Sequence, residues 1–367
     1  MYDLYYARNI YSLLVCISLA RKNKRKKILV INNGIVNGGK LLNLNHKHFK
    51  KINKFIKEEF NKIYYFNAIH DLKQKNIILR VLERSKKIKK YRKEKIISML
   101  KKLNIDNIYS SNDDFDASIY PFFRKKKFHY LEHGIGNFIN SINCSTKRKL
   151  FYFFLRLSFF LKLSNYYPIK FQNYFSILSN KKIRFQYVNG LKIRSICLFN
   201  LPDTLNFISK KIKLKKITNN KENILLNFSN FEESTPSIEI ENVINKILKQ
   251  SNKNKYNYII KDHTRRKPHK KNKRIVMNIL KKQKVSIVNL SNTIPAELVA
   301  KYYNCKKMFS LQSSLPYHYS RIDTKCQVSI FFNLSMKYHS KNVWFVGKVK
   351  LFSLNWYRNY FNNINFI

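Results

Sequence analysis

Short apolar runs alternate with amphipathic stretches along the first part of the chain. Uninterrupted apolar or β-branched runs predict buried strands at 3–6, 27–32, 62–66, 105–109 and 128–131. Apolar positions at helical spacing predict helices at 8–21, 49–60 and 77–103. Strands that alternate with helices are typical of a parallel sheet covered on both faces. The pattern therefore predicts a doubly wound α/β lobe.

The same alternation begins again after a polar break at 219–222. Strands are predicted at 223–228, 256–261, 285–290 and 307–312, with helices at 238–250 and from Pro295 onward. We therefore expect an N-terminal α/β lobe at 1–220, a C-terminal lobe at 221–350, and a segment at 351–367 that packs back on the first lobe. Between the two lobes we expect a cleft, the usual place for a ligand.

Composition limits the class of protein. The chain has 367 residues, 44% of them hydrophobic and 15% aromatic, which indicates a globular protein. Its formal net charge of +53 favours anionic partners, but the basic residues are spread along the whole chain. No zinc-finger spacing or helix-turn-helix signature accompanies them, so nucleic acid is not the expected partner.

Targeting signals are also absent from the pattern. The apolar run 10–20 has no cationic region before it, so it does not resemble a signal peptide. No apolar run reaches the roughly 18 residues of a transmembrane helix. The 5 cysteines contain no CxxC spacing, which fits a reducing compartment and predicts neither a disulfide framework nor a zinc site. We expect a cytoplasmic protein.

The stretch 147–167 combines aromatic and basic residues. Leu150–Leu163 is too short, and too interrupted by Arg156 and Lys162, to span a bilayer. Two interpretations fit it. The first is a peripheral anchor in an anionic membrane surface, on the inner face of the cytoplasmic membrane. The second is a buried helix whose cations reach solvent.

Candidate chemistry follows the strands. Glu132 comes directly after the predicted strand 128–131, in a loop where Gly134 permits unusual backbone angles. In an open α/β sheet the carboxyl ends of the strands form the ligand-binding edge. Turn chemistry alone would also explain a Glu-His-Gly sequence.

The second lobe has three polar groups at comparable positions. Lys261 and His263 follow one strand, and they suit an anionic ligand because lysine carries charge and imidazole donates near neutral pH. Glu297 lies in the first turn of the helix after Pro295, where it can bind diol hydroxyls. Ser313 and Ser314 stand at a strand-to-helix junction, which is typical of a phosphate cradle. Capping or a solvated loop would explain each group separately.

A metal site has one candidate in the sequence. Asp113, Asp114 and Asp116 form an acidic group after the strand 105–109. Such a group can bind a cation, but it also begins helices and lies in solvent. We expect capping or exposure and no metal.

Taken in order, these motifs resemble those of bacterial sialyltransferases of the polysialyltransferase and lipooligosaccharide sialyltransferase type. Those enzymes carry an acidic-acidic-Gly motif, a Lys-x-His-Pro motif, a Pro-x-Glu helix start and a Ser-Ser pair. The corresponding segments here are 132–134, 261–264, 295–297 and 313–314. The sequence departs from the family at His133, where a second acid is expected, and at Thr264, where proline is expected.

The resemblance implies a fold and a reaction. The fold is two Rossmann-like lobes in the glycosyltransferase-B (GT-B) arrangement. The reaction is an inverting transfer of sialic acid from CMP-sialic acid to a glycan hydroxyl of a capsule or lipooligosaccharide, with no cofactor or metal. Catalysis would fall to Glu132 as general base and to His263 at the leaving phosphate. The donor would be bound by Gly134, Lys261, Glu297, Ser313 and Ser314.

Three alternatives remain open at this stage. Another CMP-linked acid sugar, such as a Kdo-like one, would need the same nucleotide site. Charge alone favours a module that binds anionic polymers, whose binding would depend steeply on salt. The two departures from the family motifs are compatible with an inactive relative.

Overall fold

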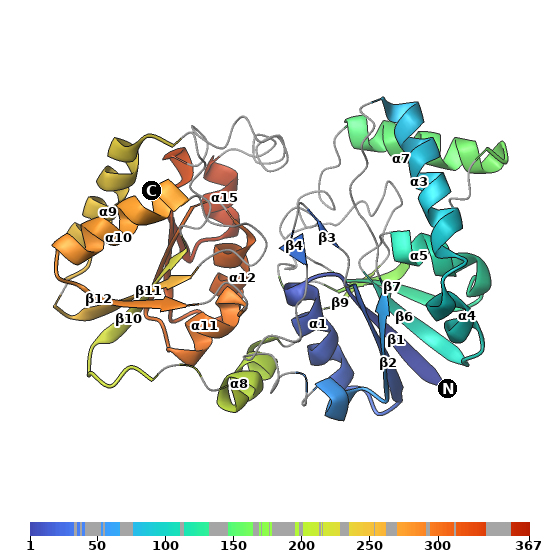
Figure 1. Ribbon diagram of the computed structural model, residues 1–367, viewed down its shortest axis with the longest axis horizontal. Coiled ribbons are helices and arrows are strands. Elements are labelled where there is room, and N and C mark those ends of the chain that lie inside the picture. Colours follow the sequence, from blue (N-terminus) through green and yellow to red (C-terminus); the bar gives the residue numbers. More distant parts are fainter. Residues whose placement is uncertain are drawn as a thin grey trace. The chain divides into compact units, whose positions relative to one another are not determined.

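The computed structural model describes residues 1–32, 35–36, 39–40, 53, 56–66, 76–110, 114–131, 146–163, 169, 171–175, 177, 195–197, 201–212, 214, 216–227, 235–252, 254–261, 270–290, 294–311, 313–334 and 354–367. The chain divides into two compact units (Figure 1). The first contains Met1–Asn45 and Phe49–Thr204, and the second contains Leu205–Ile367. The prediction of two α/β lobes is confirmed, because each unit is built on one parallel sheet.

The first unit has a seven-stranded sheet in the order β5-β2-β1-β6-β7-β8-β9, with all neighbours parallel. Its strands are β1 (Tyr2–Ala7), β2 (Lys26–Asn32), β5 (Lys62–Phe66), β6 (Ile105–Ser110), β7 (Lys127–Leu131), β8 (Phe171–Phe175) and β9 (Ser195–Cys197). Its helices are α1 (Ile10–Arg21), α3 (Ile77–Tyr91), α4 (Lys95–Lys101), α5 (Asp114–Ile119), the 3-10 turn η1 (Tyr120–Phe122) and α7 (Thr146–Phe160). A separate antiparallel pair consists of β3 (Ile35–Val36) and β4 (Gly39–Lys40).

The second unit has a six-stranded parallel sheet in the order β12-β11-β10-β13-β14-β15. Its strands are β10 (Glu222–Asn227), β11 (Tyr256–Lys261), β12 (Ser286–Leu290), β13 (Lys307–Ser310), β14 (Gln327–Ile330) and β15 (Ile364–Phe366). Its helices are α9 (Ser237–Gln250), α10 (Lys270–Lys282), α11 (Ala296–Tyr302), α12 (Ser314–Ile322) and α15 (Leu354–Tyr360), while α8 (Leu201–Lys211) crosses the division between the units.

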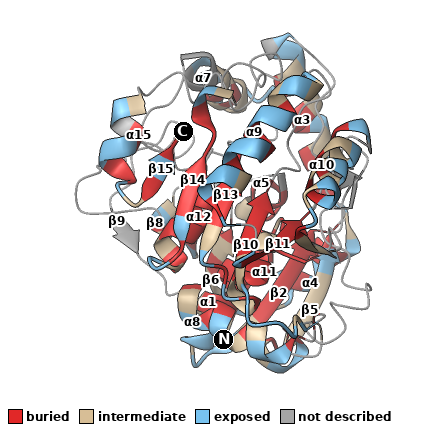
Figure 2. Ribbon diagram, turned by 90° about the vertical axis from the view of Figure 1, so that its left-hand side faces the viewer, coloured by how far each residue is buried: buried red, intermediate tan, exposed pale blue. Residues whose placement is uncertain are grey.

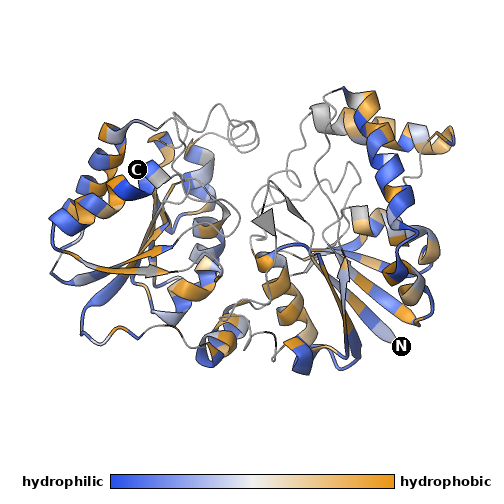
Figure 3. Cartoon of the chain, in the orientation of Figure 1, coloured by the Kyte–Doolittle hydropathy of each residue, from blue (hydrophilic) through white to orange (hydrophobic). Residues whose placement is uncertain are grey.

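Apolar residues of the strands form the cores. Figure 2 shows buried residues concentrated in the strands and exposed residues on the outer sides of helices such as α9. In Figure 3 hydrophobic colour covers most of α1, and nearly all of that helix is buried. Parallel strands need apolar residues on both faces because helices cover both. This requirement explains why uninterrupted apolar runs identified the strands in the sequence.

One predicted helix is wrong in its extent. The stretch 77–103 forms two helices, α3 and α4, because the backbone of Glu94 is extended (φ −66°, ψ 143°). The break lets both helices contribute to the same core, α3 through Tyr91 and α4 through Ile97 and Leu100. In one straight helix of this length the second half would extend away from that core. Burial of Ile97 and Leu100 therefore favours two helices over one.

The ends of the second unit also differ from the prediction. The division falls at Thr204 and Leu205 rather than at 220. In the C-terminal segment β15 pairs with β14 and so extends the second sheet. The backbone N–H of Ile367 donates to Ile330 O at 2.8 Å, and Phe332 N–H donates to Ile367 O at 2.9 Å. This pairing satisfies backbone groups that would otherwise form an open sheet edge.

Three helices end on non-glycine residues in the left-handed conformation. Lys162 (φ 58°), Lys284 (φ 53°) and Asn304 (φ 49°) follow α7, α10 and α11. After each of them the chain turns back, as where Val285 N–H donates to Leu280 O at 3.3 Å. This is the Schellman geometry, which glycine usually provides at no steric cost.

Lys284→Gly should stabilise the protein by roughly 0.5–1 kcal/mol. A non-glycine residue costs about 1–2 kcal/mol in the left-handed conformation, and glycine removes this cost. Glycine also has more conformational freedom in the unfolded chain, which offsets part of the stabilisation. Arg274→Gly, at an exposed position inside α10, is the control and should cost about 1 kcal/mol. Urea unfolding of both variants measures the difference. A Lys284→Gly variant no more stable than wild type would contradict the steric argument.

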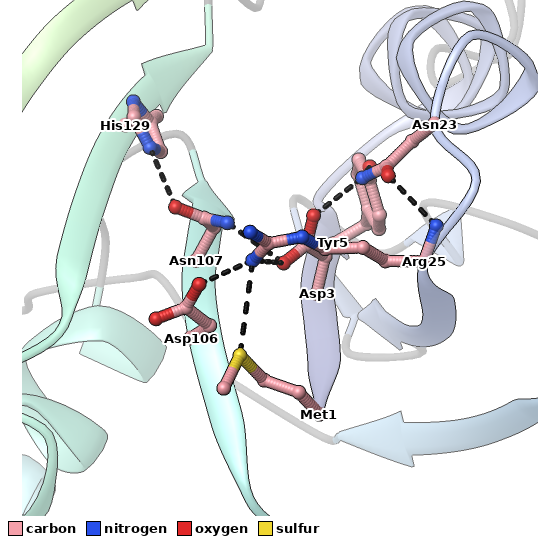
Figure 4. A network of polar contacts seen from close by, with 8 residues as sticks. All are labelled: Met1, Asp3, Tyr5, Asn23, Arg25, Asp106, Asn107 and His129. Atoms are coloured by element: carbon pink, nitrogen blue, oxygen red, sulfur yellow. Dashed lines mark hydrogen bonds and ion pairs between the residues drawn. The ribbon is translucent and has the colours of Figure 1, made fainter.

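A buried polar network joins three strands of the first sheet near their amino ends (Figure 4). Asp3 is 1% exposed. Its carboxylate accepts a hydrogen bond from Asn107 Nδ2 at 2.8 Å and forms an ion pair with Arg25 at 3.6 Å. Asn107 Oδ1 lies 3.4 Å from His129 Nε2. Since the amide oxygen only accepts, His129 carries its proton on Nε2 in this pairing. The network fixes how β1, β6 and β7 align.

Burial lowers the pKa of His129 to about 4, and a second proton on Nδ1 would find no hydrogen-bond acceptor among the described residues. The ring is stacked on Tyr109 at 4.7 Å between centroids. Between pH 6.5 and 4 the unfolded chain therefore binds a proton that the folded chain does not. Stability falls as pH falls through that window.

His129→Phe should remove this part of the pH dependence. From pH 7 to pH 5 wild type should lose about 2 kcal/mol more unfolding free energy than the variant, which keeps the stacked ring but cannot titrate. Other groups titrate in the same window, so the quantity to compare is the difference between the two proteins. Equal losses for both would show that the pKa of His129 does not differ between the folded and the unfolded chain.

Candidate functional site

Polar residues end three neighbouring strands of the second sheet. Asn227, Lys261 and Ser310 are the last residues of β10, β11 and β13, and all three are buried. The chain starts at β10, extends to β12 on one side, and then returns to β13 on the other. The gap between β10 and β13 is thus the topological switch point, where α/β sheets bind ligands at the carboxyl edge.

Asn227 connects the two strands that flank the switch point. Its Nδ2 donates to Ser310 Oγ at 2.9 Å and to Ser313 Oγ at 3.1 Å. Ser310 Oγ in turn donates to Leu311 O at 2.6 Å. Ser310 Oγ also lies 3.5 Å from Ser313 Oγ, and either hydroxyl can be the donor in that contact. Because Ser313 accepts from the amide, its own O–H can donate to Ser310 Oγ or to a bound ligand.

The helix α12 begins at this point. Ser313 is its N-cap residue in an extended conformation (φ −151°, ψ 175°), and its side chain does not cap the helix. Ser314 is the first helical residue. Helix N-termini attract anions because their first N–H groups point outward and the helix dipole is positive there. A hydroxyl donor and a helix N-terminus together suit a phosphate oxygen.

Three ionisable side chains are buried around the same edge: Lys261 and His318 are each 1% exposed, and Glu297 is 8% exposed. Glu297 lies in the first turn of α11, and His318 lies on α12. Burial raises the pKa of the Glu297 carboxyl, while positive charge on His318 and Lys261 acts in the opposite direction. A buried carboxyl group near Lys261 and His318 suits hydrogen bonds with sugar hydroxyls.

The structure brings together four residues that the sequence had selected. Lys261, Glu297 and Ser313 occupy this edge, and Ser314 opens the helix beside it. The other selected residues, Glu132, Gly134 and His263, lie outside the described residues, as do His133, Asp262 and Thr264. β7 ends at Leu131, so Glu132 is the next residue along the chain after that strand.

Sequence reasoning missed Asn227, Ser310 and His318. A signal existed for the first two, because each is a polar residue at the end of an apolar strand (ILLN and KMFS). His318 had no such signal, since its position on α12 resembles that of an ordinary helical residue.

Within the described residues, no group of three His, Cys, Asp or Glu side chains could hold a metal ion. Asp116 is buried in α5, and Asp113 lies outside the described residues. Lys261 and His318 lie buried at this edge. A lysine ammonium group suits an anion rather than a metal ion.

No protein-family model matches the sequence, and the comparison with curated protein sequences gives no match. Solved structures do resemble the chain. An α/β-galactoside α-2,3-sialyltransferase from Photobacterium phosphoreum aligns with a TM-score of 0.50 and 9% identity, over 100% of this chain and 98% of that one. The S. aureus MnaA-UDP structure aligns with a TM-score of 0.50 and 9% identity, over 90% and 79%.

A third structure, the GT-B domain of a sialyltransferase from Photobacterium damselae, has a TM-score of 0.45 and 11% identity over 100% of both chains. At such identities the likeness concerns the fold. The chain therefore has the fold class predicted from its sequence, α/β with two Rossmann-like units of the glycosyltransferase-B kind.

Proposed function

We propose that the protein is an inverting, metal-independent glycosyltransferase that moves sialic acid from CMP-sialic acid to a hydroxyl of a cell-surface glycan. The observation that carries the proposal is the carboxyl edge of the second sheet. There a buried lysine, a serine hydroxyl that can donate and the N-terminus of α12 surround the switch point. The ordered motifs and the fold shared with a bacterial sialyltransferase support the choice of reaction.

The donor's phosphate would bind at Ser313 and the start of α12. Lys261 lies in a site that water reaches poorly, so a positive charge on its ammonium group would attract phosphate more strongly than at the surface. Glu297 would accept hydrogen bonds from the ribose diol. With these groups in place the leaving CMP is stabilised by fixed donors, the role that a divalent ion has in other transferases.

The transfer itself needs a base and a stabilised leaving group. Glu132 would remove the proton of the acceptor hydroxyl while that oxygen bonds to the anomeric carbon of the donor. The bond from the anomeric carbon to the phosphate oxygen breaks, and its electron pair leaves with CMP. His263 would donate a proton or a hydrogen bond to the departing phosphate. Attack from the face opposite to CMP inverts the configuration.

CMP release measures this proposal directly. Purified full-length protein should release CMP from CMP-sialic acid in the presence of EDTA at the same rate as with Mg²⁺. Glu132→Gln and His263→Ala should each lower turnover at least about 100-fold, since general acid-base groups contribute that much or more. No CMP release from any CMP-linked sugar would refute the proposal.

The donor's sugar is the main alternative. Another CMP-linked acid sugar, such as a Kdo-like one, would use the same nucleotide site, and faster CMP release from it would replace sialic acid in the proposal. A protein that only binds anionic polymers would show strongly salt-dependent binding that Glu132→Gln leaves unchanged.

We also propose that the enzyme works in the cytoplasm, on the inner face of the cytoplasmic membrane. The net charge of +53 supports this location, because anionic lipids of that leaflet attract basic proteins. Among the residues that the structure describes, none of the helices combines the length and apolar composition that a bilayer crossing requires.

A further inference from the structure

A cavity of about 780 Å³ opens on the second unit where the helices α9 and α10 end, and we call it the α9 cavity. The two helices pack side by side (Figure 1). Eight residues from α9, from the chain just after it and from the end of α10 line the cavity: Asn242, Asn245, Lys246, Leu248, Lys249, Ser251, Asn252 and Gln283. Its volume is within the range of sites that bind small molecules.

Carboxamides dominate the lining of the α9 cavity. Three asparagines and one glutamine each bring N–H donors and a carbonyl acceptor. Sugar hydroxyls also donate and accept, so a carboxamide can form two hydrogen bonds with one sugar ring. Asn242 and Asn245 are exposed, and a ligand that enters the cavity therefore replaces water at their amides. This composition favours a ligand rich in hydroxyls.

The inner end of the α9 cavity is held by hydrogen bonds to the sheet. Ser251 is fully buried there, and its Oγ donates to Ile247 O at 2.6 Å and lies 2.7 Å from the hydroxyl of Tyr258 in β11. The amide oxygen of Asn252 accepts from Asn254 N–H at 3.0 Å, which orients that amide. The end of α9 is thus fixed before any ligand binds, so binding requires little ordering of the chain.

The charge of the lining is positive. Lys246 and Lys249 are exposed, and the eight lining residues include neither an acidic nor an aromatic side chain. The two lysines more than offset the partial negative charge that the carboxyl ends of two helices bring to the cavity. A nucleic acid base would find no ring to stack on. Carboxylates pair with lysines, so an acidic sugar fits better than a neutral one.

The α9 cavity lies away from the donor-binding edge. The helix α9 starts after the carboxyl end of β10 and runs back to the amino end of β11, which begins at Tyr256. The cavity is formed by the later part of this helix and by the residues that follow it, so it lies toward the amino edge of the sheet. The two sites share no residue.

We propose that the α9 cavity binds an acidic oligosaccharide, with its hydroxyls hydrogen-bonded to Asn242, Asn245 and Asn252 and its carboxylates paired with Lys246 and Lys249. Binding there would hold a glycan on the second unit while the donor-binding edge stays open. Because the cavity is a separate site, the inference depends neither on the identity of the donor nor on catalysis.

Isothermal titration with tetragalacturonate, a carboxylated oligosaccharide, tests the α9 cavity. Full-length protein at about 0.15 M salt, where long-range attraction by the net charge is screened, should bind it more tightly than neutral maltotetraose. Asn242→Ala combined with Asn245→Ala should weaken tetragalacturonate binding about tenfold, because hydrogen bonds to hydroxyls are lost. Lys246→Gln combined with Lys249→Gln should weaken it about fivefold and should not affect maltotetraose.

Lys306→Gln combined with Lys325→Gln is the matched control. Both lysines are exposed at the amino edge of the same sheet and do not line the cavity, so the control removes equal charge and should leave affinity unchanged. CMP should bind equally well with and without tetragalacturonate. Equal weakening by the two lysine pairs would show that net charge alone binds the sugar and would overturn the proposal. Competition with CMP, an unchanged affinity of the asparagine variant, or no binding by wild type would overturn it too.

Discussion

Lys261→Met should weaken CMP binding about 100-fold while the protein stays folded. Lys261 is 1% exposed at the end of β11, so its ammonium group acts on the phosphate with little screening by water. Charged hydrogen bonds contribute about 1.5–3 kcal/mol each, and methionine preserves the length of the side chain without the charge. Isothermal titration with CMP measures the loss, and thermal melting reports on the fold.

Lys306→Met is the matched control for this variant. Lys306 is an exposed lysine directly before β13, at the amino edge of the same sheet. It carries the same charge at the edge away from the switch point. The control should bind CMP as wild type does. If both substitutions weakened CMP binding equally, the overall charge of the protein would explain affinity and Lys261 would have no special place in the site.

Asn227→Asp should weaken CMP binding at least about 100-fold. The asparagine amide donates to Ser313 Oγ at 3.1 Å, so the serine O–H remains a donor that can turn to the ligand. A carboxylate of the same shape only accepts, so it would take that proton and add a negative charge beside the phosphate. Lowering the pH should restore part of the affinity relative to wild type, because a protonated carboxyl can donate again.

The same substitution at the other end of β10 provides the control. Asn223 Nδ2 donates to Tyr303 O at 2.7 Å, near the amino edge of the sheet. Asn223→Asp should lower the unfolding free energy, since the carboxylate would face a carbonyl, and should leave CMP affinity unchanged. An Asn227→Asp variant that loses stability but binds CMP normally would show that Asn227 supports the fold and has no part in ligand binding.

The strands could be predicted well because one physical rule fixes them. A parallel strand that is covered on both sides needs consecutive apolar residues, and runs such as Ile28–Ile31 and Tyr258–Ile260 satisfy that rule in the sequence alone. Helix limits were harder. The break at Glu94 depends on where the core lies. The helix α8 was not predicted, although Pro202 and Asp203 at its start are typical of the first turn of a helix.

Site residues could be predicted only where the local sequence marks them. Lys261 is recognisable as the polar end of an apolar strand, and Ser313 as the residue before a helix. Asn227 stands 86 residues before Ser313, and the hydrogen bond between them exists only once β10 and β13 are neighbours. His318 and Glu297 likewise interact across two different helices. Such pairings follow from strand order, which local patterns do not encode.

The position of CMP in a crystal of the full-length protein tests the central claim most directly. The account predicts that the phosphate accepts hydrogen bonds from Ser313 Oγ and from the first N–H groups of α12, with Lys261 Nζ beside it. CMP bound at any other place, with the carboxyl edge between β10 and β13 empty of phosphate, would contradict the account.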